Sequence, residues 1–227
     1  MSLRIIDEEA DSSYPQMSKN PHGIRKKYSA RRFAASAAFC PVCSRRLDDN
    51  ETFQCESCGF TGEQTMKLFP YQAPVLDTLC DNGNRFSEKE QKALTNSLKQ
   101  FSRWFPQIQV KMFTLKPDIT INLKLFGFWL FNASPLAENE TTTDRTWTIL
   151  IILGPENNIA AVPGYAVEPW IPYDDWLDLM DDYHDRSTEH GNFTASTKFL
   201  SSCRLVLKKR WSTVQAQLKK SRGRDTE

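Results

Sequence analysis

The sequence predicts an α/β sandwich with a β-hairpin at the centre of its sheet, preceded by a small cysteine-rich unit. Three observations predict it. Apolar residues recur with helical and strand periodicity in alternating segments, two C-x-x-C pairs lie near the N-terminus, and 227 residues allow one globular domain plus an appendage. Hydrophobic residues make up 40% and charged residues 25% of the chain, which excludes wholesale disorder.

Four of the six cysteines form two pairs that are separated by eleven residues. They are Cys40, Cys43, Cys55 and Cys58. This spacing predicts a zinc ribbon over residues 37–68, with a structural zinc ion whose binding folds the segment. A disulfide framework would require an oxidising compartment, and a thioredoxin-like redox pair would require only one C-x-x-C. Cys80 and Cys203 are expected to be small buried hydrophobic residues.

The larger unit is expected to begin at about Pro74, after a link over residues 66–73. Ser87 and Glu90 have the spacing of a capping box, in which each side chain satisfies a free backbone N–H at the start of a helix. Apolar residues then repeat every three to four positions until Pro106, which predicts one helix with one buried stripe.

Two strands and a second helix are predicted in the middle of this unit. Residues 108–115 alternate between apolar and polar, as in a strand, and a helix is expected from Pro117 to about Ser134. A polar loop over residues 138–144 leads to an apolar, β-branched run over residues 147–153, which is typical of a strand covered on both sides.

The remaining elements complete the order α-β-α-β-β-α-α. A turn at residues 154–158 predicts that residues 159–167 pair antiparallel with the preceding strand. Helices are expected over residues 173–186 and 193–220, and the C-terminal helix, residues 191–221, is expected to pack on or extend the domain.

Residues 74–190 carry a series of short motifs in a fixed order. They are Asp81-x-Gly83-x-x-Phe86-Ser87-x-x-Glu90, Phe131-Asn132, Asp144 and Gly164-Tyr165. With these motifs the unit resembles the TPM domain family, named after a thylakoid lumen protein, a photosystem II repair protein and a nematode receptor regulator. The resemblance implies an α/β/α sandwich found in membrane-associated or assembly-factor contexts.

The resemblance also implies candidate ligands for a divalent cation, calcium or magnesium, at Asp81 and Asp144, because some family members are reported to bind such ions and to have acid phosphatase activity. The chain departs from the family where Arg145 follows Asp144 and Ala166 follows Tyr165. Two other roles fit the residues by themselves: Asp81 could organise a turn before a helix, and Asp144 could form a surface ion pair with Arg145.

Charge is segregated along a chain whose net charge is +1. Residues 1–36 are expected to form a flexible basic arm, residues 168–189 are acidic, and residues 198–224 are basic. The acidic stretch is expected to be a solvated helix face. The basic end of the final helix fits either favourable charge at a helix C-terminus or contact with anionic lipid or RNA.

These observations predict a cytoplasmic, non-catalytic accessory protein that binds a protein partner, with membrane-embedded proteins among the candidates. The zinc ribbon would be its second contact surface. The first alternative is a divalent-cation-dependent phosphatase built on Asp81 and Asp144. The second is a nucleic-acid-binding protein that uses the ribbon and the basic arm. The longest apolar stretches are too short to span a bilayer.

Overall fold

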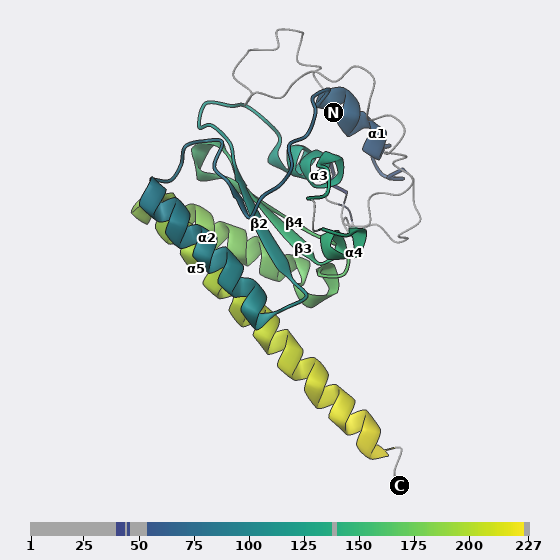
Figure 1. Ribbon diagram of the computed structural model, residues 1–227. Helices are drawn as coiled ribbons and strands as arrows, with labels where there is room; N and C mark the ends of the chain where they lie inside the picture. The colour runs from purple at the N-terminus through teal and green to yellow at the C-terminus, as the bar shows by residue number, and fades with distance from the viewer. Residues whose placement is uncertain (1–39, 44, 46–53, 138–139, 225–227) are drawn as a thin grey trace.

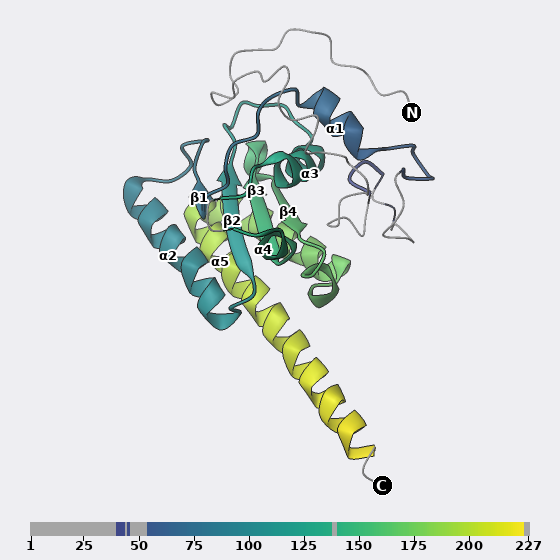
Figure 2. The same ribbon diagram turned by 45° about the vertical axis from the view of Figure 1, so that its right-hand side comes forward.

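The computed structural model describes residues 40–43, 45, 54–137 and 140–224, and the predicted basic arm lies outside them. The described chain forms three layers, with a four-stranded sheet between two layers of helices (Figure 1). One sheet face packs against α2 (Glu88–Trp104) and α5 (Tyr173–Arg224). The other packs against α3 (Leu123–Ala133) and the end of α1 (Gly62–Leu68), as Figure 2 shows.

The sheet contains β1 (Leu79–Cys80), β2 (Gln109–Thr114), β3 (Thr148–Leu153) and β4 (Ile159–Pro163), in that spatial order. The first three strands are parallel, and β4 is antiparallel to β3. The predicted hairpin is therefore present, but its predicted position at the centre of the sheet is wrong. The parallel pair β2 and β3 is central, and β4 forms the edge, because α3 supplies the crossover that a parallel pair needs.

The central strands are buried on both faces. All six residues of β3 are buried, as predicted from its continuous apolar run. In β2 the polar Lys111 and Thr114 are buried as well, so the alternation in the sequence does not mark a solvent-exposed face.

Helix α2 forms where the sequence predicts it. Ser87 is its N-cap and accepts a hydrogen bond from the Glu90 backbone, while the Glu90 side chain accepts one from the Ser87 N–H at 2.8 Å. The helix buries Leu94, Leu98 and Phe101 against the sheet.

Two predicted boundaries need correction. Helix α3 begins at Leu123 rather than near Pro117, because the Asn122 side chain caps it by accepting hydrogen bonds from the Lys124 and Leu125 N–H groups. The predicted loop over residues 138–144 includes the start of a short helix, α4 (Thr142–Thr146), which is capped by Thr141. The start of each helix is therefore fixed by the hydrogen bonds of its own capping side chain.

The predicted link over residues 66–73 contains the end of α1 and carries buried apolar side chains. Phe69 and Ala73 pack in the same cluster as α3, so this segment belongs to the core. Two 3₁₀ turns, η1 (Pro155–Asn157) and η2 (Glu168–Trp170), precede β4 and α5.

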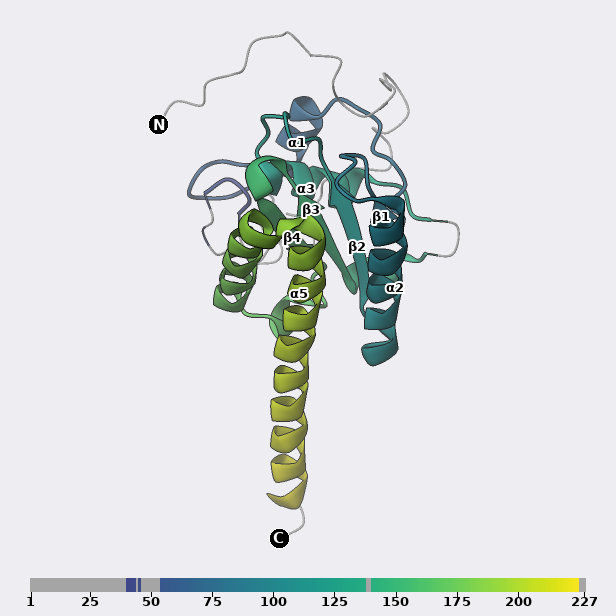
Figure 3. The same ribbon diagram turned by 90° about the vertical axis from the view of Figure 1, so that its left-hand side faces the viewer.

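The two helices predicted at the C-terminus are the halves of α5, which join at a kink at Gly191 with φ of 81°. Glycine adopts this left-handed conformation at little steric cost. The second half lies between α2 and the first half, and then continues beyond the sheet (Figure 3).

Candidate metal centre and acidic loops

The four paired cysteines converge on one point. Their Sγ atoms all lie within 4.8 Å of one another, with Cys40 Sγ 3.6 Å from Cys58 Sγ and Cys43 Sγ 3.7 Å from Cys55 Sγ. Zinc–sulfur bonds of about 2.3 Å in a tetrahedron place sulfurs roughly 3.8 Å apart. Among the described residues, this is the one group of three or more metal-ligating side chains that lie within reach of a common ion.

Matching backbone turns position the two pairs. The Cys40 N–H donates to the Arg45 carbonyl at 2.8 Å, and the Cys55 N–H donates to the Phe60 carbonyl at 2.9 Å. Gly59 closes the second turn with a positive φ of 72° and donates to the Cys55 carbonyl. In each turn the first cysteine is thereby buried and the second is exposed.

The thiols differ in proton affinity. Burial raises the pKa of Cys40 to about 12, whereas the Arg45 backbone N–H lowers the pKa of Cys43 to about 7. Thiolates are the form that binds metals, so an entering ion has to displace the Cys40 proton.

The metal centre is attached to α3. The Phe60 ring packs edge to face on Phe128, with ring centroids 5.8 Å apart, and Leu125 completes the contact. Cys40 and Cys55 belong to the same small apolar cluster. The cluster therefore depends on a helix of the larger domain.

Asp81 organises the turn between β1 and α2. Its carboxylate accepts hydrogen bonds from the backbone N–H groups of Arg85 and Phe86, at 2.9 and 3.1 Å. It also accepts from Thr114 Oγ1 at 2.6 Å and from Gln91 Nε2 at 3.1 Å. The turn interpretation of Asp81 therefore agrees with the structure.

The glycine two positions after Asp81 is required by a close contact. The Gly83 N–H donates to Thr114 Oγ1, and a Cβ atom at Gly83 would lie 2.2 Å from the Leu115 carbonyl oxygen. The Asp81-x-Gly83 motif is thus explained by backbone packing.

Asp144 caps α4. Its carboxylate accepts hydrogen bonds from the Thr141 N–H and hydroxyl, both at 2.7 Å, and these bonds lower the pKa of Asp144. Arg145 donates to the carbonyls of Phe131 and Ser134. The structure thus gives Arg145 partners on α3 and at its end, rather than a surface ion pair with Asp144, which was one of two open alternatives.

The two aspartates lie at opposite ends of the central strands. Asp81 bonds Thr114 at the end of β2, which is level with the end of β3, whereas the Asp144 carbonyl accepts from Thr148 Oγ1 at the start of β3. The five steps along β3 span roughly 17 Å. One ion cannot bridge both carboxylates, because oxygen ligands lie about 2.3 to 2.6 Å from calcium.

Sequence reasoning missed a buried ion pair near the start of β1. Lys111 Nζ lies 3.1 Å from the Glu140 carboxylate and donates to the Leu76 carbonyl at 3.0 Å. The Glu140 side chain is 6% exposed. The only sequence signal is that Lys111 interrupts an apolar strand, and the hydrophobic pattern does not identify Glu140 as its partner.

A hollow of about 340 Å³ brings together motifs that are distant in the sequence. Its lining includes Phe131, Asn132, Arg145, Gly164 and Tyr165. A Cβ atom at Gly164 would lie 2.3 Å from the Thr146 carbonyl oxygen, so this position requires glycine.

Neither a protein-family model nor a curated protein sequence matches the chain. Five chains of solved structures match. One is the solution NMR structure of the N-terminal domain of a protein from P. gingivalis, which is 14% identical, with a TM-score of 0.43. The match covers 66% of this chain and 92% of that domain, and at this TM-score it assigns neither family nor function. No helix in the described part of the chain is long and apolar enough to cross a membrane.

Proposed function

We propose that the four cysteines bind one structural zinc ion, and that the protein is a TPM-like, non-catalytic accessory factor that contacts a protein partner through the ribbon and the α/β domain. The observation that carries this proposal is the closed four-sulfur cluster fixed on α3. Four thiolates fill a tetrahedral shell and leave no position for a substrate or a catalytic water molecule.

The motif residues support the TPM-like part of the proposal. Asp81 and Gly83 build one tight turn, while Phe131, Asn132, Gly164 and Tyr165 line one hollow. The phosphatase alternative has less support, because the Asp81 carboxylate already accepts four hydrogen bonds, and it lies at the opposite end of the central strands from Asp144.

The metal assignment is tested by the metal content of protein purified from a cytosolic host under reducing conditions. We expect one zinc ion per chain, lost in the double variant Cys43→Ser/Cys58→Ser. The matched control is Cys80→Ser, a thiol outside the cluster, which should retain zinc. Full zinc content in the double variant would contradict the assignment, as would iron in place of zinc.

The accessory role is tested by photo-crosslinking in cells. A crosslinker at Val42, which is 40% exposed, or at Tyr165, which is 51% exposed, should capture a protein that also binds the purified chain. A crosslinker at Lys89, exposed at the start of α2, is the control and should not capture it. Phosphate-ester turnover that is lost in Asp81→Asn would favour the hydrolase instead.

A further inference from the structure

The second half of α5 projects from the domain with a strong charge bias. Beyond the lower end of α2 it runs clear of the sheet (Figures 1 and 3). Every charged residue between positions 198 and 224 is basic. These residues are Lys198, Arg204, Lys208, Lys209, Arg210, Lys219, Lys220, Arg222 and Arg224.

Large apolar side chains are exposed where this helix leaves the domain. Trp104 at the end of α2 is 57% exposed and Leu205 is 56% exposed. Trp211 is 46% exposed, and one side of its ring packs against Trp170 with ring centroids 5.6 Å apart. The Arg204 guanidinium lies 4.7 Å from the centre of the Trp104 ring, which ties the two helices together at this level. We call this surface the α2–α5 end and define it by Trp104, Arg204, Leu205, Lys208, Lys209 and Trp211.

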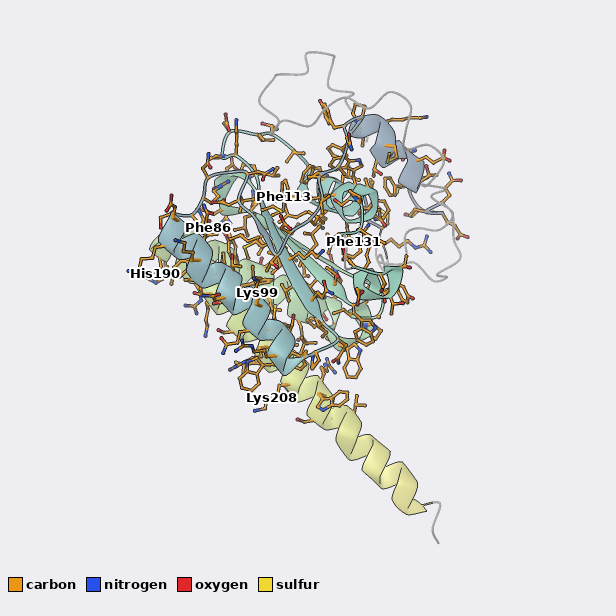
Figure 4. All side chains as sticks on the ribbon, viewed as in Figure 1. Phe86, Lys99, Phe113, Phe131, His190 and Lys208 are labelled. Carbon is orange, nitrogen blue, oxygen red and sulfur yellow. The ribbon has the colours of Figure 1, made fainter. Side chains whose placement is uncertain are left out.

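The polar groups around these side chains are mainly cationic. Lys208 and Lys209 are exposed, as is Arg103 beside Trp104 (Lys208 is labelled in Figure 4). The acidic first half of α5 contributes Asp175, which pairs with Arg210 at 3.6 Å. That pair neutralises Arg210 and leaves the positive charge of the two lysines facing solvent.

We propose that the α2–α5 end docks on an anionic lipid bilayer. Tryptophan rings favour the interface between headgroups and acyl chains, and lysine side chains reach from that depth to lipid phosphates. A basic helix with exposed Trp and Leu side chains is the sequence type that lies in this interface. Charge complementarity selects a negatively charged surface.

This inference goes beyond the proposed function, because it uses neither the cysteines nor the hollow. The metal centre is attached to α3, on the sheet face opposite α2 and α5 (Figure 2). The chain could therefore hold a protein partner and a membrane surface at the same time.

The test is co-sedimentation of the full chain with vesicles of phosphatidylcholine and phosphatidylglycerol, compared with phosphatidylcholine alone. We expect binding to the mixed vesicles that weakens with salt. Each lysine near an anionic surface contributes about fivefold in affinity, so Lys208→Gln/Lys209→Gln should bind about thirtyfold more weakly.

The matched control is Lys89→Gln/Lys92→Gln. It removes the same charge from exposed positions at the other end of α2, roughly 20 Å away along the helix, and should change binding by less than about twofold. Equal loss in the two double variants would overturn the proposal, because net charge alone would then explain binding. Absence of binding to the mixed vesicles would also overturn it.

Depth of insertion gives a second readout. Acyl chains labelled with bromine should quench tryptophan fluorescence, and Trp104→Phe/Trp211→Phe should lose most of that quenching while keeping the fold by circular dichroism. Unchanged quenching in this variant would overturn the proposed orientation. If single-stranded RNA displaces the vesicles and binds more tightly, or if the same residues form a dimer interface instead, the surface has a different partner and the proposal fails.

Discussion

The sheet and the metal centre are stabilised in different ways. Every residue of β3 is buried, and apolar clusters cover both faces of the sheet. Among the described residues around the metal centre, the buried apolar cluster consists of Cys40, Cys55, Phe60 and Phe128 of α3.

The sizes of the free-energy contributions in the two regions explain this contrast. A fully buried Leu, Ile or Phe side chain contributes about 1.5 to 3 kcal/mol, so two large clusters can offset the entropy of ordering a sheet. The two cysteines and two phenylalanines described at the cysteine turns do not by themselves offset that entropy. A structural zinc ion contributes about 10 to 16 kcal/mol of apparent binding free energy, which becomes folding free energy.

Removal of the metal is expected to have the largest effect, and it tests whether the cysteine turns depend on metal while the sheet does not. A chelator should abolish hydrogen-exchange protection of the Cys40, Cys55 and Gly59 amides, whose acceptors lie within the cysteine turns. The Leu150 amide in β3 should stay protected. Hydrogen exchange followed by NMR checks both, and simultaneous loss of protection in both regions would show that the sheet also depends on the metal.

A cavity in the sheet should have the next largest effect. Leu150 is fully buried, and Leu150→Ala should lower the free energy of unfolding by about 2 to 5 kcal/mol in urea titrations. Leu68→Ala, at a position that is 57% exposed, is the control and should change it by less than about 0.5 kcal/mol. A small effect at Leu150 would mean that the sheet is not the main source of stability.

The cap of α2 tests a local contribution inside the larger domain. Ser87→Ala should cost about 1 kcal/mol at pH 7, because it removes a hydrogen bond to a free N–H group. The control Ser97→Ala removes a hydroxyl that bonds the Ala93 carbonyl within the same helix, and should be neutral or slightly stabilising.

The same cap predicts a pH dependence. Hydrogen bonds from Ser87 lower the pKa of Glu90 below its usual value of 4.5, so the cap stabilises the fold above that pH. The contribution is lost as the pH falls through the folded-state pKa. The cost of Ser87→Ala should therefore shrink at pH 3, and an equal cost at both pH values would contradict the reciprocal cap.

An effect similar in size to that of the cap is expected for the contact between the two regions. A double-mutant cycle with Phe60→Leu and Phe128→Leu should give a coupling of about 0.5 to 1.5 kcal/mol that disappears when the metal is removed. The pair Phe69 and Phe126, with centroids 5.6 Å apart, lies in the main core and is the control. Its coupling should survive chelation, and loss of both couplings would mean that the regions unfold together.

Features that depend on neighbouring residues could be predicted from the sequence. The capping box at Ser87, the apolar run that became β3, and the cysteine spacing each lie within a short stretch of chain. The start of α3 was predicted too early, at Pro117-Asp118, because that pair resembles a helix start, whereas Asn122 supplies the cap.

The roles of the acidic residues could not be predicted in the same way. Asp81 is a turn organiser partly because Thr114, 33 residues away, donates to it. Lys111 and Glu140 become a buried pair only once β2 and the segment before α4 meet. Such contacts depend on strand order, which periodicity does not specify.

By itself, the sequence determined α2, the halves of α5, the strands β2 to β4 and the cysteine spacing, since hydrogen bonding and apolar spacing within each segment are local. The short elements α1, β1 and α4 were not predicted. The tertiary structure decided the order of the strands, the edge position of β4 and the separation of Asp81 from Asp144. The physical reason is that apolar burial favours any arrangement that covers β3 on both faces. Packing of the crossover helix α3 and of α5 then selects one of these arrangements.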